Sequence, residues 1–193
     1  MVRILDLEEY AKENNVPIMM KDGIEFLLKY IEENNIKTIL EIGTAIGYSA
    51  IRMALINKEI KITTIERDND RYIEALKNID EFELNNQIEV IYDDAFNIEL
   101  KEKYDLIFID ASKGNNIYFF EKFSNNLAKN GVIMTDNLSF HGRVEDDSLI
   151  TSKNQLGIVK KIKTFIEYLD NNKDYTTTYV EVGDRIAISK KNN

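Results

Sequence analysis

Acidic and amide side chains stand at the ends of several apolar runs in this chain, and they are its best candidates for chemistry. Glu41, Glu66 and Asp110 each close such a run, and the pair Asp136-Asn137 closes another. Short apolar runs rich in β-branched residues are typical of buried parallel strands. Because the carboxyl ends of parallel strands gather at the edge of a sheet where ligands bind, these side chains are expected to meet there.

Asp110, Asp136 and Asn137 have the composition of a cation site. Neighbouring strand ends lie about 5 Å apart, so the three side chains can converge on one point. Two carboxylates and an amide oxygen favour Mg²⁺ or Ca²⁺ over zinc. The structural alternative is that Asp110 caps the next helix and that Asp136-Asn137 forms a turn. We favour a divalent cation, because the three residues occur together.

Lys113 follows Asp110 by three residues and is therefore expected beside the same cleft. A lysine next to a divalent cation loses its proton more readily, and it can then act as a general base toward a substrate hydroxyl. A solvated surface lysine is the alternative. His141 is the only histidine, so no histidine triad or histidine-rich zinc cluster is available. It lies in a polar segment, 138–152, that is expected to form an active-site loop, where it contacts either substrate or solvent.

The segment from Thr38 to Ser49 reads as a strand, a glycine turn and a helix, which is the nucleotide-binding opening of a doubly wound sheet. Its spacing is Glu-x-Gly-x-x-x-Gly, with Glu41, Gly43 and Gly47, rather than the pattern that binds a pyrophosphate. An acidic residue before the turn repels phosphate and attracts a cation. S-adenosylmethionine carries a sulfonium and an ammonium group, so it fits better than NAD. A structural turn without a ligand is the alternative.

Three further positions suit the nucleoside part of such a ligand. Glu66 lies about 20 residues beyond the glycine turn, where an acidic residue accepts hydrogen bonds from ribose hydroxyls. An acid in the loop after the third strand, Asp93 or Asp94, is placed to accept from an adenine amino group while Phe96 stacks on the ring. The alternatives are a surface glutamate and a solvated acidic loop. Met19 and Met20 are candidates for lining the cleft, although core packing explains methionines equally well.

The periodicity of the chain predicts the elements that position these residues. Apolar runs predict strands, and amphipathic spacing predicts helices between them. The expected strands are 38–42, 61–66, 88–92, 104–110, 131–135, 175–182 and 185–189, and the expected helices are 3–14, 22–34, one after the glycine turn, 69–79, 115–128 and 153–171.

Alternation of strands and helices favours an α/β fold in three layers, a Rossmann-like doubly wound sheet. The connection at 182–185 is too short for a crossover, so the last two strands form a hairpin. The sheet is therefore expected to be mostly parallel, with one antiparallel edge strand from the C-terminal hairpin. We expect residues 1–193 to form one domain, with the helices of residues 3–34 covering an edge of the sheet or acting as a lid.

Composition excludes several classes of protein. The 193 residues are 44% hydrophobic and 31% charged, which is typical of a soluble globular protein. No apolar run reaches the roughly 20 residues that span a bilayer, so no membrane association is expected. The absence of cysteine and of a signal-like N-terminus favours a cytoplasmic location. A net charge of −9 argues against broad nucleic-acid binding but leaves room for a local basic face.

Four segments in order resemble a known family. They are residues 40–49 (LEIGTAIGYS), 64–66 (TIE), 105–113 (DLIFIDASK) and 135–137 (TDN). The chain resembles, from about Ile18 to Ser189, the class I S-adenosylmethionine-dependent, metal-dependent O-methyltransferases of the catechol and caffeoyl-CoA type, O-methyltransferase family 3. The resemblance implies that Asp110, Asp136 and Asn137 hold Mg²⁺ or another divalent cation and that Lys113 is the general base.

The same resemblance implies a cofactor site and an assembly. The residues that would hold S-adenosylmethionine are Met20, Glu41, Gly43, Ser49, Glu66, Asp94, Ala95 and Asp110. The family also implies a homodimer. A non-catalytic cofactor-sensing module would need neither a metal nor a base, so the set of Asp110, Lys113, Asp136 and Asn137 argues against that alternative.

Two segments, 42–54 and 135–144, narrow the resemblance to the bacterial enzymes that methylate 5-hydroxyuridine at the tRNA wobble position, giving 5-methoxyuridine. A hydroxyl beside a uracil carbonyl can chelate a metal much as a catechol does. tRNA is therefore the expected partner, with Arg143 a candidate for a phosphate contact. A small phenolic acceptor is the alternative. The basic run Lys153, Lys160, Lys161 and Lys163 is better interpreted as a solvated helix face.

Overall fold

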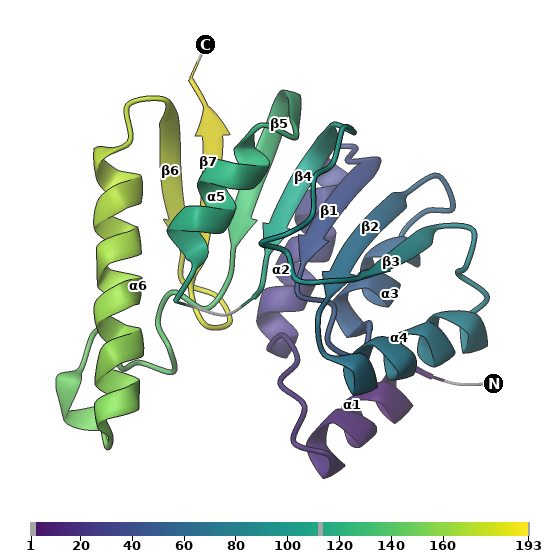
Figure 1. Ribbon diagram of the computed structural model, residues 1–193, viewed down its shortest axis with the longest axis horizontal. Helices are drawn as coiled ribbons and strands as arrows, with labels where there is room; N and C mark the ends of the chain where they lie inside the picture. The colour runs from purple at the N-terminus through teal and green to yellow at the C-terminus, as the bar shows by residue number, and fades with distance from the viewer. Residues whose placement is uncertain (1–2, 112–113, 193) are drawn as a thin grey trace.

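The computed structural model describes residues 3–111 and 114–192, and it contains a central sheet flanked by helices (Figure 1). The strands are β1 (Thr38–Ile42), β2 (Lys61–Glu66), β3 (Ile88–Tyr92), β4 (Tyr104–Ile109), β5 (Leu127–Thr135), β6 (Tyr175–Val180) and β7 (Ile186–Lys191). The helices are α1 (Ile4–Glu13), α2 (Lys21–Glu33), α3 (Tyr48–Ala54), α4 (Asn69–Glu81), α5 (Asn116–Ser124), α6 (Lys153–Asn171) and the short 3₁₀ helix η1 (Asp147–Leu149).

The seven strands form one mixed sheet in the order β3-β2-β1-β4-β5-β7-β6. The first five strands are parallel, whereas β7 pairs antiparallel with both β5 and β6. The predicted α/β fold with a mostly parallel sheet and a C-terminal hairpin is confirmed. In this order the antiparallel strand β7 lies between β5 and the edge strand β6, so β7 is not itself at the edge of the sheet.

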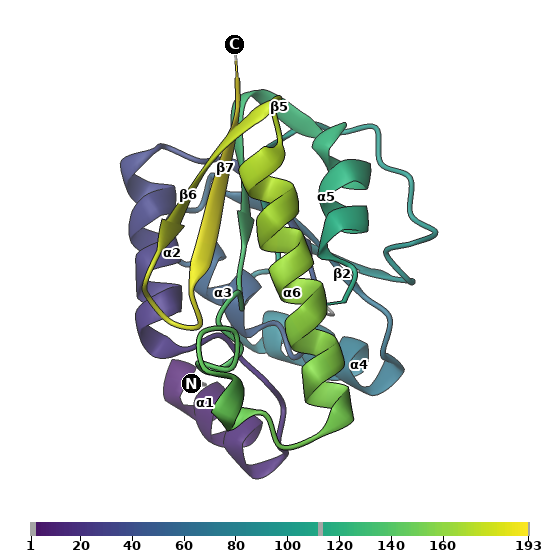
Figure 2. The same ribbon diagram turned by 90° about the vertical axis from the view of Figure 1, so that its left-hand side faces the viewer.

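Apolar side chains cover both faces of the sheet, and alternate residues of a strand point to opposite faces. In β1, Ile39 joins the cluster shared with α1, α2 and α3, whereas Leu40 and Ile42 join the cluster shared with α5 and α6. Figure 2 shows these two sets of helices on either side of the sheet. Because both faces are covered, the inner strands β1 and β4 are almost continuously apolar, as the sequence predicts.

The N-terminal helices pack on the same face as α3. Tyr48, the first residue of α3, donates from its hydroxyl to Oε1 of Glu8 in α1 over 2.8 Å. Burial, together with the bond to Glu8, raises the pKa of Tyr48 to about 12, so it remains a donor. The domain assignment 1–193, with helices 3–34 as an edge cover or lid, stays a prediction. No helix in the described ranges 3–111 and 114–192 is long and apolar enough to cross a membrane.

The predicted helix over 115–128 is too long. Helix α5 ends at Ser124, and β5 already begins at Leu127. The cause is Asn126, whose buried side-chain amide donates to the carbonyls of Leu100 (2.9 Å) and Glu102 (3.0 Å). The backbone there also pairs with β4, since Tyr104 N donates to Asn126 O. These partners are distant in sequence, so helical periodicity could not show them.

Candidate active site

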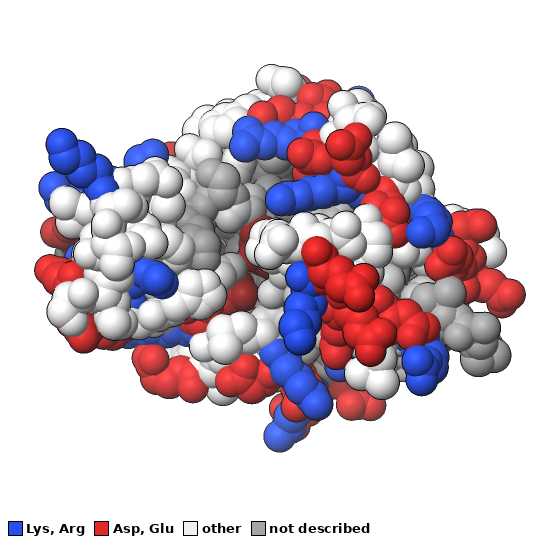
Figure 3. Space-filling model, turned by 90° about the horizontal axis from the view of Figure 1, so that it is seen from below, with Lys and Arg blue, Asp and Glu red and all other residues white. Residues whose placement is uncertain are grey.

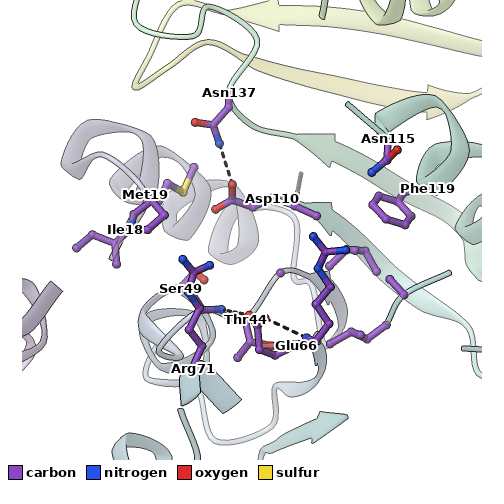
Figure 4. Close-up of a pocket in the computed structure, with 18 of the residues that line it drawn as sticks. Ile18, Met19, Thr44, Ser49, Glu66, Arg71, Asp110, Asn115, Phe119 and Asn137 are labelled. Carbon is purple, nitrogen blue, oxygen red and sulfur yellow. Dashed lines mark hydrogen bonds between the residues drawn. The ribbon is translucent and has the colours of Figure 1, made fainter. Parts of the chain in front are cut away.

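A cavity of about 500 Å³ opens where the five parallel strands end (Figure 4). On the molecular surface this side shows a hollow surrounded by side chains of both charges (Figure 3). The segments after β1, β2, β3, β4 and β5 all contribute to its wall, and so does the connection between α1 and α2. The predicted convergence of strand ends is therefore present in the fold.

The glycine turn after β1 forms one wall of the cavity. Gly43 has φ +107° and Gly47 has φ +84°, both in the left-handed region that favours glycine. A Cβ at Gly43 would overlap the carbonyl oxygen of Asp110, so the turn passes directly against the end of β4. Gly47 is the N-cap of α3, whose first residues line the cavity.

Glu41 lies beneath this turn and is fully buried. Ser49 Oγ donates to one of its carboxylate oxygens, and Thr64 Oγ1 donates to the other over 2.6 Å. Burial raises the pKa of Glu41 to about 7. Glu41 is not among the residues that line the cavity. It therefore acts on the cavity through Ser49, which does line it.

Glu66 ends β2 and lines the cavity while remaining 7% exposed. Its Oε2 accepts from the backbone N–H of Ala45 in the glycine turn over 2.8 Å. Its Oε1 accepts from the backbone N–H groups of Arg67 and Asp68, each over 2.9 Å. The carboxylate thus joins the β2 end to the glycine turn and is held in place at the cavity wall.

The segment after β3 supplies an acidic and aromatic wall. Asp94 Oδ1 accepts from Phe96 N over 3.0 Å, and this hydrogen bond lowers the pKa of the Asp94 carboxyl. Arg67 also pairs with Asp94, over 3.2 Å. The ring of Phe96 lies 5.0 Å from that of Phe119, centroid to centroid, and both rings line the cavity. A carboxylate and two rings are suitable for a heteroaromatic group with an amino substituent.

The ends of β4 and β5 meet at the opposite wall. Asn137 Nδ2 donates to Asp110 Oδ1 over 2.8 Å, as Figure 4 shows. Asp136 N donates to the carbonyl oxygen of Ile109. This hydrogen bond continues the pairing of β4 and β5 to the ends of both strands. The Asp136 side chain is only 4% exposed. Two carboxylates and an amide thus stand at adjacent strand ends, and residue types with such oxygen donors are the ones that Mg²⁺ prefers.

The structure places most of the predicted site residues around one cavity. The predicted residues that line it are Met20, Gly43, Ser49, Glu66, Asp94, Ala95, Asp110 and Asn137. Glu41 and Asp136 are buried behind the wall, and Lys113 lies outside the described residues. Within the described ranges, no three histidine, cysteine, aspartate or glutamate side chains gather as metal ligands. The predicted set has only two carboxylates and an amide, so that finding does not bear on it.

Sequence reasoning missed several residues that shape the cavity. Thr64 bonds both Glu41 and Thr44, and Asn78 donates its side-chain amide to Ile46 O in the glycine turn over 2.9 Å. Arg71 lines the cavity from α4, a helix that showed no charge pattern directed there. The sequence signal for these residues is weak, because polar residues inside predicted strands and helices are usually interpreted as solvent-facing.

The segment after Asn137 adopts an unusual backbone. Asn137, Phe140 and His141 have φ values of +69°, +50° and +56°, although none is glycine. Phe140 and His141 line the cavity, as the expected active-site loop requires. Arg143, the candidate phosphate contact, donates to the Phe140 carbonyl over 3.2 Å and places its guanidinium 5.2 Å from that ring.

Comparison with known proteins decides the family. A model of the family described as O-methyltransferase matches residues 3–192. The chain belongs to this O-methyltransferase family. A solved structure from Staphylococcus aureus, provisionally described as a caffeoyl-CoA O-methyltransferase, is 37% identical, with a TM-score of 0.92, and covers 100% of this chain and 93% of that one.

Two further relatives support the same assignment. A catechol O-methyltransferase from Niastella koreensis is 36% identical over 58% of this chain and 54% of its own length. The O-methyltransferase from Bacillus cereus, solved in complex with SAH, is 25% identical, with a TM-score of 0.82, over 98% of this chain and 90% of that one. The prediction of an S-adenosylmethionine-dependent O-methyltransferase is confirmed at this level.

Proposed function

We propose that this O-methyltransferase moves a methyl group from S-adenosylmethionine to the hydroxyl of 5-hydroxyuridine at the tRNA wobble position, with Mg²⁺ bound beside the acceptor. The observation that carries the proposal is the pairing of Asp110 with Asn137 at the end of a cavity whose other walls suit a nucleoside. The product would be 5-methoxyuridine.

The methyl donor is proposed to lie along the glycine turn. Gly43 lines the cavity without a side chain, and Ser49, whose hydroxyl donates to Glu41, lines it at the start of α3. Glu66, Asp94 and Ala95 line the cavity, and we propose that Glu66 accepts from the ribose hydroxyls and that Asp94 and Ala95 contact the adenine. Met20 and Asp110 complete the set, while Glu41 holds Ser49 from below. Because the cavity wall here is preformed by hydrogen bonds, little ordering is needed on binding.

The acceptor is proposed to lie against the opposite wall. Asp110, Asp136 and Asn137 would hold the cation, which when bound lowers the pKa of a nearby hydroxyl and orients it. Lys113 takes the proton from that hydroxyl. The acceptor oxygen then attacks the methyl carbon in line, the carbon–sulfur bond breaks, and S-adenosylhomocysteine is released. Holding the two reactants about 3 Å apart accounts for much of the rate gain.

The tRNA acceptor is supported by the resemblance of segments 42–54 and 135–144 and by Arg67 and Arg71, two cations that line the cavity. A small phenolic acceptor is the second candidate. It is supported by relatives that are named for catechol and caffeoyl-CoA. Both acceptors present two neighbouring oxygens, so the chemistry proposed for the site is the same. We also propose a homodimer, which sedimentation of the purified protein would test.

Mass spectrometry of tRNA nucleosides tests the acceptor. Cells that lack this protein should lose 5-methoxyuridine and accumulate 5-hydroxyuridine, and purified enzyme should restore the methyl group in vitro. Catechol and caffeic acid, assayed in parallel with radiolabelled donor, serve as the comparison. Unchanged 5-methoxyuridine together with turnover of a phenol would replace the first acceptor by the second.

Lys113 is tested by Lys113→Ala, with Lys153→Ala, an exposed lysine at the start of α6, as a control. The variant should bind S-adenosylhomocysteine like the parent protein and lose at least about 100-fold in kcat, the range typical of general-base catalysis. Calorimetry and single-turnover kinetics measure the two quantities. Turnover close to that of the parent protein would remove Lys113 from the mechanism.

The cation site is tested by Asp136→Ala and by a chelator. Titration of Mn²⁺, followed by electron paramagnetic resonance in the presence of S-adenosylhomocysteine, should show one site in the parent protein and none in the variant. Donor affinity should stay the same. Full methyl transfer in excess chelator would refute the cation, whatever the acceptor proves to be.

A further inference from the structure

The turn between β6 and β7 contacts the acceptor wall from the far end of the chain. Asp184 in this turn is 3% exposed, and its Oδ1 accepts from the backbone N–H of His141 over 2.5 Å. The same oxygen lies 3.9 Å from His141 Nδ1. The backbone carbonyl oxygen of Asp184 accepts from Ser139 N over 2.9 Å, and that of Arg185 accepts from Leu138 N over 3.0 Å. One turn thus supplies three acceptors to three loop amides.

These hydrogen bonds fall where the loop backbone is strained. Asn137, Phe140 and His141 are in the left-handed region, which costs a residue with a side chain free energy unless surrounding contacts impose it. The three bonded amides, of Leu138, Ser139 and His141, lie within this same stretch of the chain. The turn therefore supplies contacts that impose the conformation. Asp184 is the residue of this turn whose side chain accepts a hydrogen bond from a loop amide.

The same turn also reaches the other side of the cavity. Gly183 N donates to Asp22 Oδ2 at the start of α2 over 3.0 Å, and Asp22 Oδ1 accepts from Gly23 N. A Cβ on Gly183 would come within 3.1 Å of Gly23 Cα, so the two backbones are in close contact. Met19 and Met20, just before this contact, line the cavity. The turn is thus packed between the loop 137–142 and the start of α2, two segments far apart in the sequence.

We infer that Asp184 is a positioning residue for the acceptor wall. It holds residues 137–142 in the conformation that brings the Asn137 amide to Asp110 and directs Phe140 and His141 into the cavity. The side-chain hydrogen bonds to the glycine turn come from β2 and α4 and do not include Asp184. Its predicted effects on the cation and the acceptor rest on the proposed function. Its effect on the loop does not.

The test compares Asp184→Ala with Asp184→Asn and with a matched control, Asp174→Ala. Asparagine keeps an oxygen that can accept from His141 N, whereas alanine does not. Asp174 is an exposed carboxylate at the other end of the same hairpin. The measurements are hydrogen exchange of the 138–142 amides, Mn²⁺ affinity with S-adenosylhomocysteine bound, and the affinity for S-adenosylhomocysteine alone.

Asp184→Ala should speed exchange at Leu138, Ser139 and His141 by at least about tenfold, because the loop opens locally. It should weaken Mn²⁺ binding by about 10-fold or more, the range for residues that orient metal ligands. Affinity for S-adenosylhomocysteine should change less than about twofold. Asp184→Asn should recover most of the loss, and Asp174→Ala should match the parent protein.

Two results would overturn the inference. One is normal loop exchange and normal Mn²⁺ affinity in Asp184→Ala. The other is a uniform loss, in which donor affinity and exchange across the whole sheet deteriorate together, because a general structural role predicts that outcome. If the parent protein binds no Mn²⁺, the proposed cation site fails. Loop exchange and donor affinity then still decide whether Asp184 positions the loop.

Discussion

The two walls of the cavity are built in different ways. The donor wall, residues 43–49 with Glu66, is held by hydrogen bonds within one strand–helix–strand unit, such as Ala45 N to Glu66 and Ser49 Oγ to the buried Glu41. The acceptor wall, Asp110 with residues 137–142, is also held by the C-terminal hairpin, where Asp184 accepts from His141. The first wall is held mainly by its own unit, whereas the second also takes hydrogen bonds from the C-terminal hairpin.

The walls also differ in where they place unusual backbone. The left-handed positions in the donor wall are Gly43 and Gly47, which adopt such φ values at little cost, and one residue with a side chain, Ala45. In the acceptor wall, left-handed φ values fall on Gly142 and on three residues with side chains, Asn137, Phe140 and His141. Strain at residues with side chains persists only where surrounding structure imposes it. The acceptor wall is therefore the part that distant substitutions should disturb.

The largest effect is expected from Gly43→Ala, because Gly43 is where the two walls touch. A methyl group there meets the Asp110 carbonyl oxygen, and φ +107° is unfavourable for alanine. We expect the free energy of unfolding to fall by about 3 kcal/mol or more, and donor affinity to fall with it.

Chemical denaturation and calorimetry with S-adenosylhomocysteine measure both effects. Gly157→Ala is the matched control, because nothing lies within 4 Å of the Cβ it would add in α6. That change should stabilise the protein by about 0.5–1 kcal/mol. Normal donor affinity in Gly43→Ala would show that the walls do not depend on a common contact.

A slightly smaller effect on stability is expected from a change of pH, and it should come from Glu41 beneath the donor wall. The pKa of Glu41 is raised from its ordinary value of 4.5 to about 7, so the folded state keeps a proton that the unfolded state has lost. Stability should therefore fall as pH rises from about 5 to 8, by roughly 2–3 kcal/mol through this group. Glu41→Gln should remove this part of the pH dependence.

Denaturant titrations at several pH values measure the contribution of Glu41 as the difference in the free energy of unfolding between the parent protein and Glu41→Gln. Glu89→Gln on β3 removes a carboxylate that is exposed rather than buried and should leave the pH profile unchanged. A parent profile that Glu41→Gln does not alter would mean that Glu41 ionises normally in the folded state.

Ser49→Ala should have an intermediate effect confined to the donor wall. It removes the hydroxyl that donates to Glu41 and leaves one buried carboxylate oxygen without that donor. We expect a loss of about 1–2 kcal/mol in stability, the usual cost of removing one partner of a buried hydrogen bond. The affinity for Mn²⁺ at the opposite wall should stay within error. A loss at both sites would show coupling between the walls that the hydrogen bonds do not indicate.

The smallest effect is expected from Glu8→Gln, which weakens a distant tie to the donor wall. Glu8 and Tyr48 are 40 positions apart, much like the 43 between His141 and Asp184. Because the donor wall is already held within its own unit, stability should fall by about 1 kcal/mol or less, with donor affinity nearly unchanged. If donor affinity falls as steeply as acceptor function falls in Asp184→Ala, the contrast between the walls is wrong.

The elements were largely predictable because each strand carries a local signal. Residues 104–109 are apolar on both faces, and Gly43 and Gly47 identify the turn after β1 without reference to the rest of the chain. The end of α5 was not predictable, since Asn126 leaves helical structure to bond residues 100 and 102 on another segment. For the same reason Arg71 and Asn78 looked like ordinary helix residues.

The sequence by itself determined the α/β alternation, the glycine turn and the positions of Glu66, Asp110 and Asn137 at strand ends, because these depend on short-range periodicity and on the shared edge of parallel strands. Only the tertiary structure decided that Glu41 lies beneath the wall rather than in it and that Asp184 holds the loop opposite. Burial and contacts between segments more than 40 residues apart arise from packing, and no local pattern records them.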